Sequence, residues 1–169
     1  MPRPGSFFSF PNPVNEVAAR TVAAGVMVLA LVTLVADLPG LLIPITLGFW
    51  ARVLTGPTLS PLGQLATRVV APRLPKYAKA VPGPPKRFAQ SIGAVVTTAA
   101  TVLWLVGEWR FAQALLVLMV VFAFAESVLA ICVGCHIFSF LMRRGVIPES
   151  ICEECADISK RADYSTAKG

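Results

Sequence analysis

All four cysteines lie in the last 38 residues of the chain, where they form two Cys-x-x-Cys pairs. Cys132 and Cys135 end the last long apolar segment, and Cys152 and Cys155 follow after 16 further residues. This spacing falls within the range of zinc sites built from four thiolates. Each pair can place two sulfurs on one short arc. The sequence therefore predicts a Zn site at Cys132, Cys135, Cys152 and Cys155, with Fe as the less favoured metal.

A redox interpretation of the same cysteines stays open. Two dithiols on the reducing side of a membrane could relay electrons or carry sulfur as a persulfide, which requires thiols of lowered pKa. Arg143 and Arg144 would favour thiolates in the first pair, whereas Glu153 and Glu154 would oppose them in the second. Structural disulfides are not expected if the cysteines face the cytosol. A third interpretation makes the first pair small buried hydrophobes and the tail pair incidental.

The composition places these cysteines in a membrane protein. Of the 169 residues, 14% are charged, against roughly 25% in a typical soluble domain, and the mean hydropathy is +0.71. So small a soluble domain could not bury this apolar surface. This excludes a disordered tail, a disulfide-rich secreted domain and a soluble enzyme. The net charge of +6 points to membrane topology and anionic lipid.

Four apolar runs predict an all-α integral membrane bundle of four transmembrane helices. The expected spans cover about residues 17–36, 38–54, 88–107 and 111–134. The second is the shortest and contains two prolines. We expect no cleaved signal peptide, so residues 1–142 form the membrane domain and residues 143–169 a cysteine-containing tail.

Charge asymmetry sets the orientation. The connection 52–87 holds seven basic residues and no acidic one, whereas the two tight turns are net negative. The positive-inside rule therefore places both termini and this loop in the cytoplasm of a bacterial inner membrane. Ser60-Pro61 predicts the start of a short helix, either packed under the bundle or lying in the membrane interface. The expected contacts with lipid headgroups are Arg68, Arg73, Lys76, Lys79, Lys86 and Arg87.

Glu126 interrupts the last span, where an ionisable group is costly and usually functional. Counted along the helix, it lies near the cytoplasmic side, at the level of Arg20 and Arg52. The sequence predicts a buried charge pair between Glu126 and one of these arginines. A carboxylate that handles protons is the alternative.

Several functions lack their signatures. The chain has no nucleotide-binding fingerprint, and its single histidine, His136, excludes a bis-histidine haem. The basic loop lacks the interleaved aromatic residues of nucleic-acid grooves. We therefore expect no haem, no nucleotide and no nucleic acid as partners.

Four segments, listed here in order, carry a resemblance to a known family: Pro13-Val14-Asn15-Glu16 with Ala19-Arg20, Ser60-Pro61-Leu62-Gly63, Pro82-Gly83-Pro84-Pro85-Lys86-Arg87-Phe88-Ala89-Gln90 and Cys132-Val133-Gly134-Cys135. Over about residues 10–140 the chain resembles a bacterial four-span membrane family described only as a domain of unknown function. The resemblance implies a small multi-span protein with thioredoxin-like or rhodanese-like partners.

Together these observations favour a membrane-embedded accessory or relay protein for thiol-redox or sulfur chemistry. The alternative is a non-catalytic scaffold, or a subunit of a larger membrane complex, whose metal-bound cysteines dock a partner.

Overall fold

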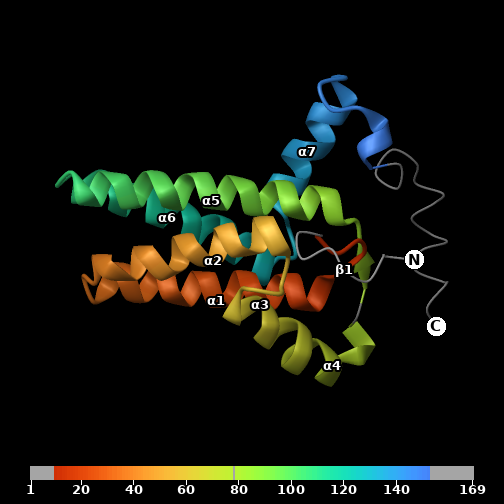
Figure 1. The fold of residues 1–169 in the computed structure, drawn as a ribbon, viewed down its shortest axis with the longest axis horizontal. Coiled ribbons are helices and arrows are strands. Elements are labelled where there is room, and N and C mark those ends of the chain that lie inside the picture. Colours follow the sequence, from red (N-terminus) through yellow and green to blue (C-terminus); the bar gives the residue numbers. More distant parts are fainter. Residues whose placement is uncertain (1–9, 78, 153–169) are drawn as a thin grey trace.

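The computed structural model describes residues 10–77 and 79–152. Four helices run side by side along the length of the molecule (Figure 1): α1 Glu16–Val35, α2 Leu42–Thr55, α5 Gly83–Leu105 and α6 Trp109–Ser127. At one end of this bundle, α7 (Val133–Arg143) projects at a steep angle, and α3 (Pro61–Leu65) and α4 (Ala71–Arg73) lie on the opposite side. The described part of the chain is thus mostly helical.

Three of these helices, α1, α5 and α6, are long and apolar enough to cross a membrane. The first two agree closely with the expected spans 17–36 and 88–107. A shorter apolar helical segment, Pro39–Thr55, joins the 3-10 turn Pro39–Leu41 to α2 and covers the second expected span. The length and composition of these helices are consistent with a membrane protein.

Small side chains let the long helices approach closely. α1 packs on α6, and α5 packs on both α2 and α6. One core cluster contains Ala18, Val22, Phe49 and Ala94, and a second contains Ala30, Leu42, Ala112 and Leu116. Without water to satisfy polar groups, helices in lipid associate through such close contacts and through hydrogen bonds between helices. The Thr46 and Thr101 hydroxyls form one such bond between α2 and α5, at 3.0 Å.

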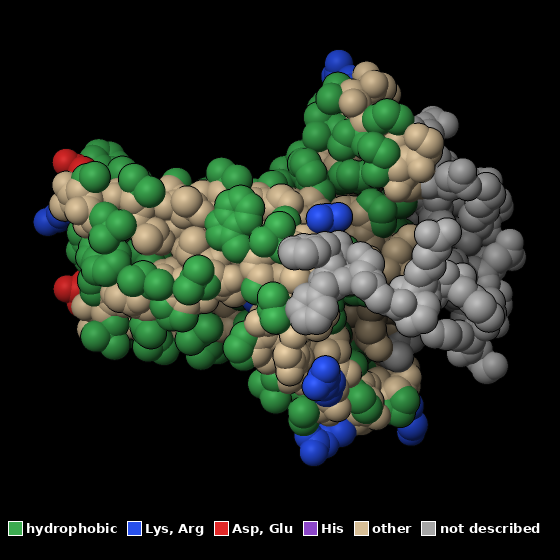
Figure 2. Space-filling view, viewed as in Figure 1, with side chains coloured by type: hydrophobic (Ala, Val, Ile, Leu, Met, Phe, Trp, Pro, Cys, Tyr) green, Lys and Arg blue, Asp and Glu red, His purple; other side chains and the backbone are tan. Residues whose placement is uncertain are grey.

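The bundle has an apolar outer surface and charged ends. Large hydrophobic side chains such as Val35, Leu47, Leu105 and Phe111 are exposed along it. Figure 2 shows hydrophobic side chains over the length of the body, with Lys and Arg gathered toward the end that carries α3, α4 and α7. The acidic residues in this view lie at the other end. This distribution suits a helical bundle surrounded by lipid.

The last apolar run is broken, which corrects the expected span 111–134. α6 ends at Ser127, and Ala130 has a positive φ of 58° before α7 begins at Val133. The Ile131 N–H returns to the Ala125 carbonyl at 2.9 Å, a bond that closes off the helix end. The chain consequently turns at the end of α6 and presents the first cysteine pair there.

The loop helix begins as expected. The Ser60 hydroxyl accepts from the Gly63 N–H at 3.2 Å, with Pro61 in the first helical turn. The helix continues through the π-helical segment Ala66–Val70 into α4 and packs on α1 through Ala66, which is fully buried.

Two short strands fasten this loop to the start of α1. β1 (Val14–Asn15) pairs antiparallel with β2 (Ala80–Val81), with Val14 opposite Val81. Asn15 then caps α1 by accepting from the Val17 N–H at 2.9 Å. A 3-10 turn, Pro75–Tyr77, precedes β2, and another, Glu149–Ile151, follows α7.

Candidate functional site

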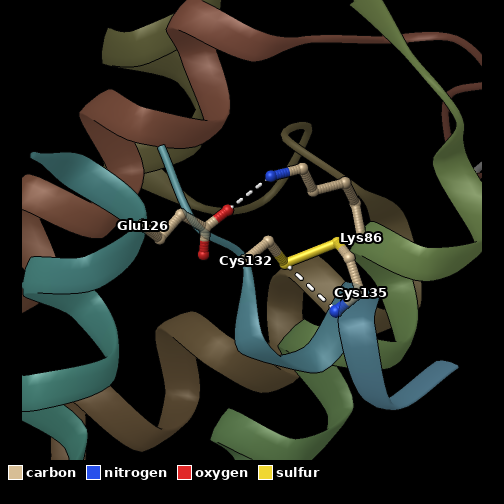
Figure 3. Close-up of a disulfide and its surroundings, with 4 residues drawn as sticks. All are labelled: Lys86, Glu126, Cys132 and Cys135. Carbon is tan, nitrogen blue, oxygen red and sulfur yellow. Dashed lines mark hydrogen bonds and ion pairs between the residues drawn. A yellow bond between two sulfur atoms is a disulfide. The ribbon is translucent and has the colours of Figure 1, made fainter. Parts of the chain in front are cut away.

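The first cysteine pair lies where α7 begins (Figure 3). Cys132 and Cys135 are joined by a disulfide, with their Cα atoms 5.2 Å apart. Cys132 is the N-cap residue of α7, and its Sγ accepts a hydrogen bond from the Cys135 N–H at 3.3 Å. The start of a helix carries partial positive charge, which favours a thiolate there. This placement suits a pair that cycles between disulfide and dithiol.

The two sulfurs have different surroundings. Cys132 is 7% exposed and lines a cavity inside the bundle. Cys135, one turn further along α7, is half-buried and does not line that cavity. A partner arriving from the surface therefore finds Cys135 the more accessible of the two.

Gly134 lets α7 pack tightly on α5. A Cβ added there would lie 2.5 Å from the Ala89 Cβ and 2.6 Å from the Ala89 Cα, distances that no real side chain tolerates. One turn further along, Phe138 meets the Phe88 ring edge-on, with the ring centroids 5.6 Å apart. The glycine between the cysteines thus fixes the disulfide against α5.

An ion pair lies beside the disulfide. The Lys86 Nζ donates to the Glu126 Oε1 at 2.6 Å, and both side chains are largely buried. Figure 3 shows these two side chains meeting next to Cys132. The expected pairing of Glu126 with Arg20 or Arg52 is therefore wrong. Lys86, placed among the lipid-headgroup contacts, is instead held inside the protein.

The two arginines have other partners. The Arg20 Nε and Nη2 both donate to the Ser127 carbonyl at 3.0 Å, and Nη2 also reaches the Val128 carbonyl at 3.3 Å. These carbonyls end α6 and would otherwise lack donors, so Arg20 acts as a C-cap supplied by α1. It thereby holds the turn that leads to Cys132.

Arg52 is 5% exposed and faces α5 and the loop helix. Its Nε donates to the Gln90 Oε1 at 2.8 Å and its Nη1 to the Ser60 hydroxyl at 3.1 Å. Its guanidinium also lies 4.5 Å from the centre of the Phe49 ring. Uncharged partners on three elements thus take the place of the expected carboxylate.

The cavity of about 70 Å³ reaches from the disulfide into the bundle between α1, α5 and α6. Its wall is mainly apolar, with Val22, Phe49 and Met119 deep in the bundle. Glu126 and Gln90 supply polar groups to this wall. The cavity therefore connects one sulfur of the disulfide to an apolar interior.

The basic residues of the loop divide into two groups. Four expected headgroup contacts are exposed: Arg68, Arg73, Lys76 and Lys79. Arg87 is exposed as well, but its Nε donates to the Val53 carbonyl at 3.0 Å, which ties α5 to α2. Headgroup binding stays a prediction for these five residues.

The second cysteine pair is described only in part. Cys152 is buried against Phe138 and Met142 of α7, so the chain folds back on α7 after the positive-φ turn at Gly145. Cys152 is disulfide-bonded too, and Cys155 lies outside the described residues. Within residues 10–77 and 79–152, no group of three or more His, Cys, Asp or Glu side chains is placed to hold a metal. The four-cysteine zinc site therefore stays a prediction.

Sequence reasoning missed Ala89 and Gln90 as site residues, and it assigned Lys86 to lipid headgroups instead of to Glu126. With Gly93 they follow the spacing i, i+3, i+4 and i+7, which places them on one face of α5. Lys86 reaches Glu126, Ala89 contacts Gly134, and Gln90 lines the cavity. This spacing was the signal that could have identified them, and their segment meets the Cys-Val-Gly-Cys segment in space.

Comparison with known proteins identifies the family. No curated protein and no solved structure matches the chain. One family model matches residues 14–143, a stretch that includes Cys132 and Cys135 and ends before Cys152. Because this match covers most of the 169 residues, the chain belongs to the family described as "Domain of unknown function (DUF4395)".

Proposed function

We propose that this protein is a membrane-embedded relay for thiol-redox or sulfur chemistry, working through the Cys132–Cys135 pair. The observation that carries this proposal is the disulfide at the N-terminus of α7, in which Cys135 is half-buried and Cys132 is buried and lines a cavity. An ion pair and a glycine contact hold the disulfide in place.

The membrane arrangement is part of the proposal. α1, α5 and α6 span the bilayer, and Pro39–Thr55 forms a fourth, shorter span. Its 17 residues extend about 25 Å, slightly less than a ~30 Å hydrocarbon core. The basic end, with both termini and the loop helix lying in the interface, faces the cytoplasm of a bacterial plasma membrane.

This orientation supports a catalytic disulfide. Cytosolic thiols are kept reduced, and disulfides found there are usually transient and catalytic or redox-sensing. The cysteine pair lies at the basic end of the bundle, beside Lys86 and the Arg20 cap. A cytosolic partner of the thioredoxin-like class would reach it from that side.

The exchange follows from the geometry. A thiolate of the partner attacks the Cys135 Sγ, the S–S bond breaks, and Cys132 leaves as a thiolate that accepts the Cys135 N–H bond. The second partner thiol then attacks the mixed disulfide and releases Cys135. The partner dithiol becomes a disulfide, and two electrons and two protons pass to Cys132 and Cys135. A rhodanese-like partner would instead deliver a persulfide sulfur to the reduced pair.

Trapping a mixed disulfide tests whether the partner attacks Cys135 and not Cys132. The probe is a thioredoxin-like protein whose second active-site cysteine is replaced by serine, activated as a mixed disulfide with a small aromatic thiol. Cys132→Ser leaves a free thiol at Cys135, the more accessible of the two positions, and should capture the probe. Cys135→Ser leaves the buried Cys132 and should capture much less. Equal capture would overturn the assigned order of attack. If a reduced thioredoxin-like protein with both active-site cysteines intact fails to reduce the native Cys132–Cys135 disulfide, the relay is overturned.

A further inference from the structure

The proposed soluble partner reacts with Cys135, which leaves Cys132 available to a second reaction partner. Cys132 lines the cavity of about 70 Å³, whereas Cys135 lies outside it. A relay that accepts two electrons at Cys135 must pass them to a second carrier. The cavity is where such a carrier can meet Cys132.

The cavity wall selects the chemical class of the carrier. It is mainly aliphatic and aromatic, and a peptide thiol or a nucleotide would lose its hydration there without compensation. Cavities of this kind bind apolar ligands that a few polar groups orient. Gln90 and Glu126 are such groups, an amide and a carboxylate on the same wall as Cys132.

The outer rim of the cavity is also apolar. Ile137 on α7 lines the cavity and is 41% exposed, and Phe122 on α6 lines it too. Both belong to the region where α7 leaves α6, so a ligand enters past hydrophobic side chains. A carrier dissolved in the bilayer can follow this route.

We propose that the cavity admits the carbonyl edge of a lipid-soluble quinone, which takes electrons from the reduced cysteine pair. This inference rests on the relay function proposed above. A buried cavity of about 150 Å³ holds a benzene ring. The smaller cavity here accepts the carbonyl edge of the ring, while the rest of the ring and its tail lie along Phe122 and Ile137.

The step balances in electrons and protons. The S–H bonds of Cys132 and Cys135 break, a disulfide forms between them, and two electrons and two protons pass to the quinone, which becomes a quinol. The Gln90 amide can donate to one quinone carbonyl. Glu126 can accept the Cys132 proton and pass it to the quinone oxygen.

The experiment uses the full-length protein, reduced, freed of reductant and held in anaerobic lipid nanodiscs. A short-tailed benzoquinone is added, and the loss of free thiols is followed together with quinol absorbance. Ala123→Leu places a larger side chain into the cavity. Because this side chain takes up space that the quinone needs, the quinone reaction should slow roughly 10-fold or more, which corresponds to about 1.4 kcal/mol or more.

Ala112→Leu is the matched control, since Ala112 is also buried on α6 but lies in the other core cluster, away from the cavity. It should leave quinone oxidation at the wild-type rate. Ala123→Val is the second cavity variant should Ala123→Leu not fold, and exchange with dithiothreitol shows for each variant whether its disulfide is intact.

The outcomes separate the two proposals. If wild-type protein exchanges with the thioredoxin-like probe but quinone leaves its thiols unoxidised, the quinone site is refuted and the relay stands. Equal slowing in the Ala123 and Ala112 variants would also refute the site. If the disulfide exchanges with no thiol at all, the relay itself is refuted.

Discussion

Replacing Gly134 by alanine should push α7 away from α5. The new Cβ would lie 2.5 Å from the Ala89 Cβ and 2.6 Å from the Ala89 Cα. Unstrained contacts need at least about 3.4 Å, so α7 must shift by roughly 1 Å or distort its first turn. Overpacking of this kind costs about 1–3 kcal/mol.

The assay is unfolding in lipid micelles by a denaturing detergent, combined with the rate at which dithiothreitol reduces the disulfide. Gly134→Ala should lower the free energy of unfolding by about 1–3 kcal/mol and speed the reduction, because Cys132 loses its cover. Adding Ala89→Gly to Gly134→Ala should restore only part of the lost stability, because the new Cβ also lies too close to the Cα of residue 89. Gly40→Ala is the control, because nothing lies within 4 Å of an added Cβ there. Unchanged stability and reduction rate in Gly134→Ala would refute the close approach of α7 and α5.

Three further predictions concern the surroundings of the disulfide. Glu126→Ala should lower the free energy of unfolding by about 3 kcal/mol, because it leaves Lys86 buried without its carboxylate. Glu126→Gln should have a smaller effect, and the double variant Lys86→Met/Glu126→Leu should recover stability in the same unfolding assay. Equal losses in all three variants would contradict a direct ion pair. Arg20→Met should lower the free energy of unfolding by about 1.5–3 kcal/mol, because it removes the hydrogen bonds to the end of α6, and Arg20→Lys should have an intermediate effect. Amide hydrogen exchange should become faster at residues 127–132 in Arg20→Met. Unchanged exchange there would refute the capping role. If the cysteines work as a relay, the reduced protein should release four titratable thiols and retain no zinc in elemental analysis. One zinc per chain with four protected thiols would instead favour the scaffold and the four-cysteine zinc site.

The long helices could be predicted because charge-free apolar runs of membrane-spanning length are visible in the sequence itself. It did not predict the end of α6 at Ser127, since residues 128–132 are as apolar as the helix before them. The turn depends on Arg20 from a distant helix and on the backbone of Ala130. Such a contact leaves no local signal.

Local signals near helix starts were of mixed value. Ser60 caps the loop helix as expected because its hydroxyl and Pro61 act within one turn. Asn12 also precedes a proline, but α1 is capped by Asn15. The Asn12 side chain instead accepts from the Gly83 N–H at 2.9 Å, a contact across 71 positions. Pairing between β1 and β2 keeps this segment extended and delays the helix.

The sequence identified Glu126 and the first cysteine pair as site residues, but it did not identify the partner of Glu126 or the disulfide. Position along the chain placed Glu126 near the basic end, where Arg20, Arg52 and Lys86 all lie. Depth alone cannot tell which of these cations faces Glu126, because that depends on the rotation of each helix about its axis. Likewise the cysteine spacing indicated chemistry at Cys132 and Cys135, whereas the disulfide between them follows from their geometry at the start of α7.

Reduction of the Cys132–Cys135 disulfide in oriented membranes tests the relay most directly. Membrane vesicles of defined orientation are incubated with a reduced thioredoxin-like protein, and the two cysteines are then counted with a thiol-specific mass label. Both thiols should be released together in inside-out vesicles and should remain oxidised in right-side-out vesicles. Reduction from the outer face only, or no reduction from either face, would contradict a relay that works from the cytoplasm.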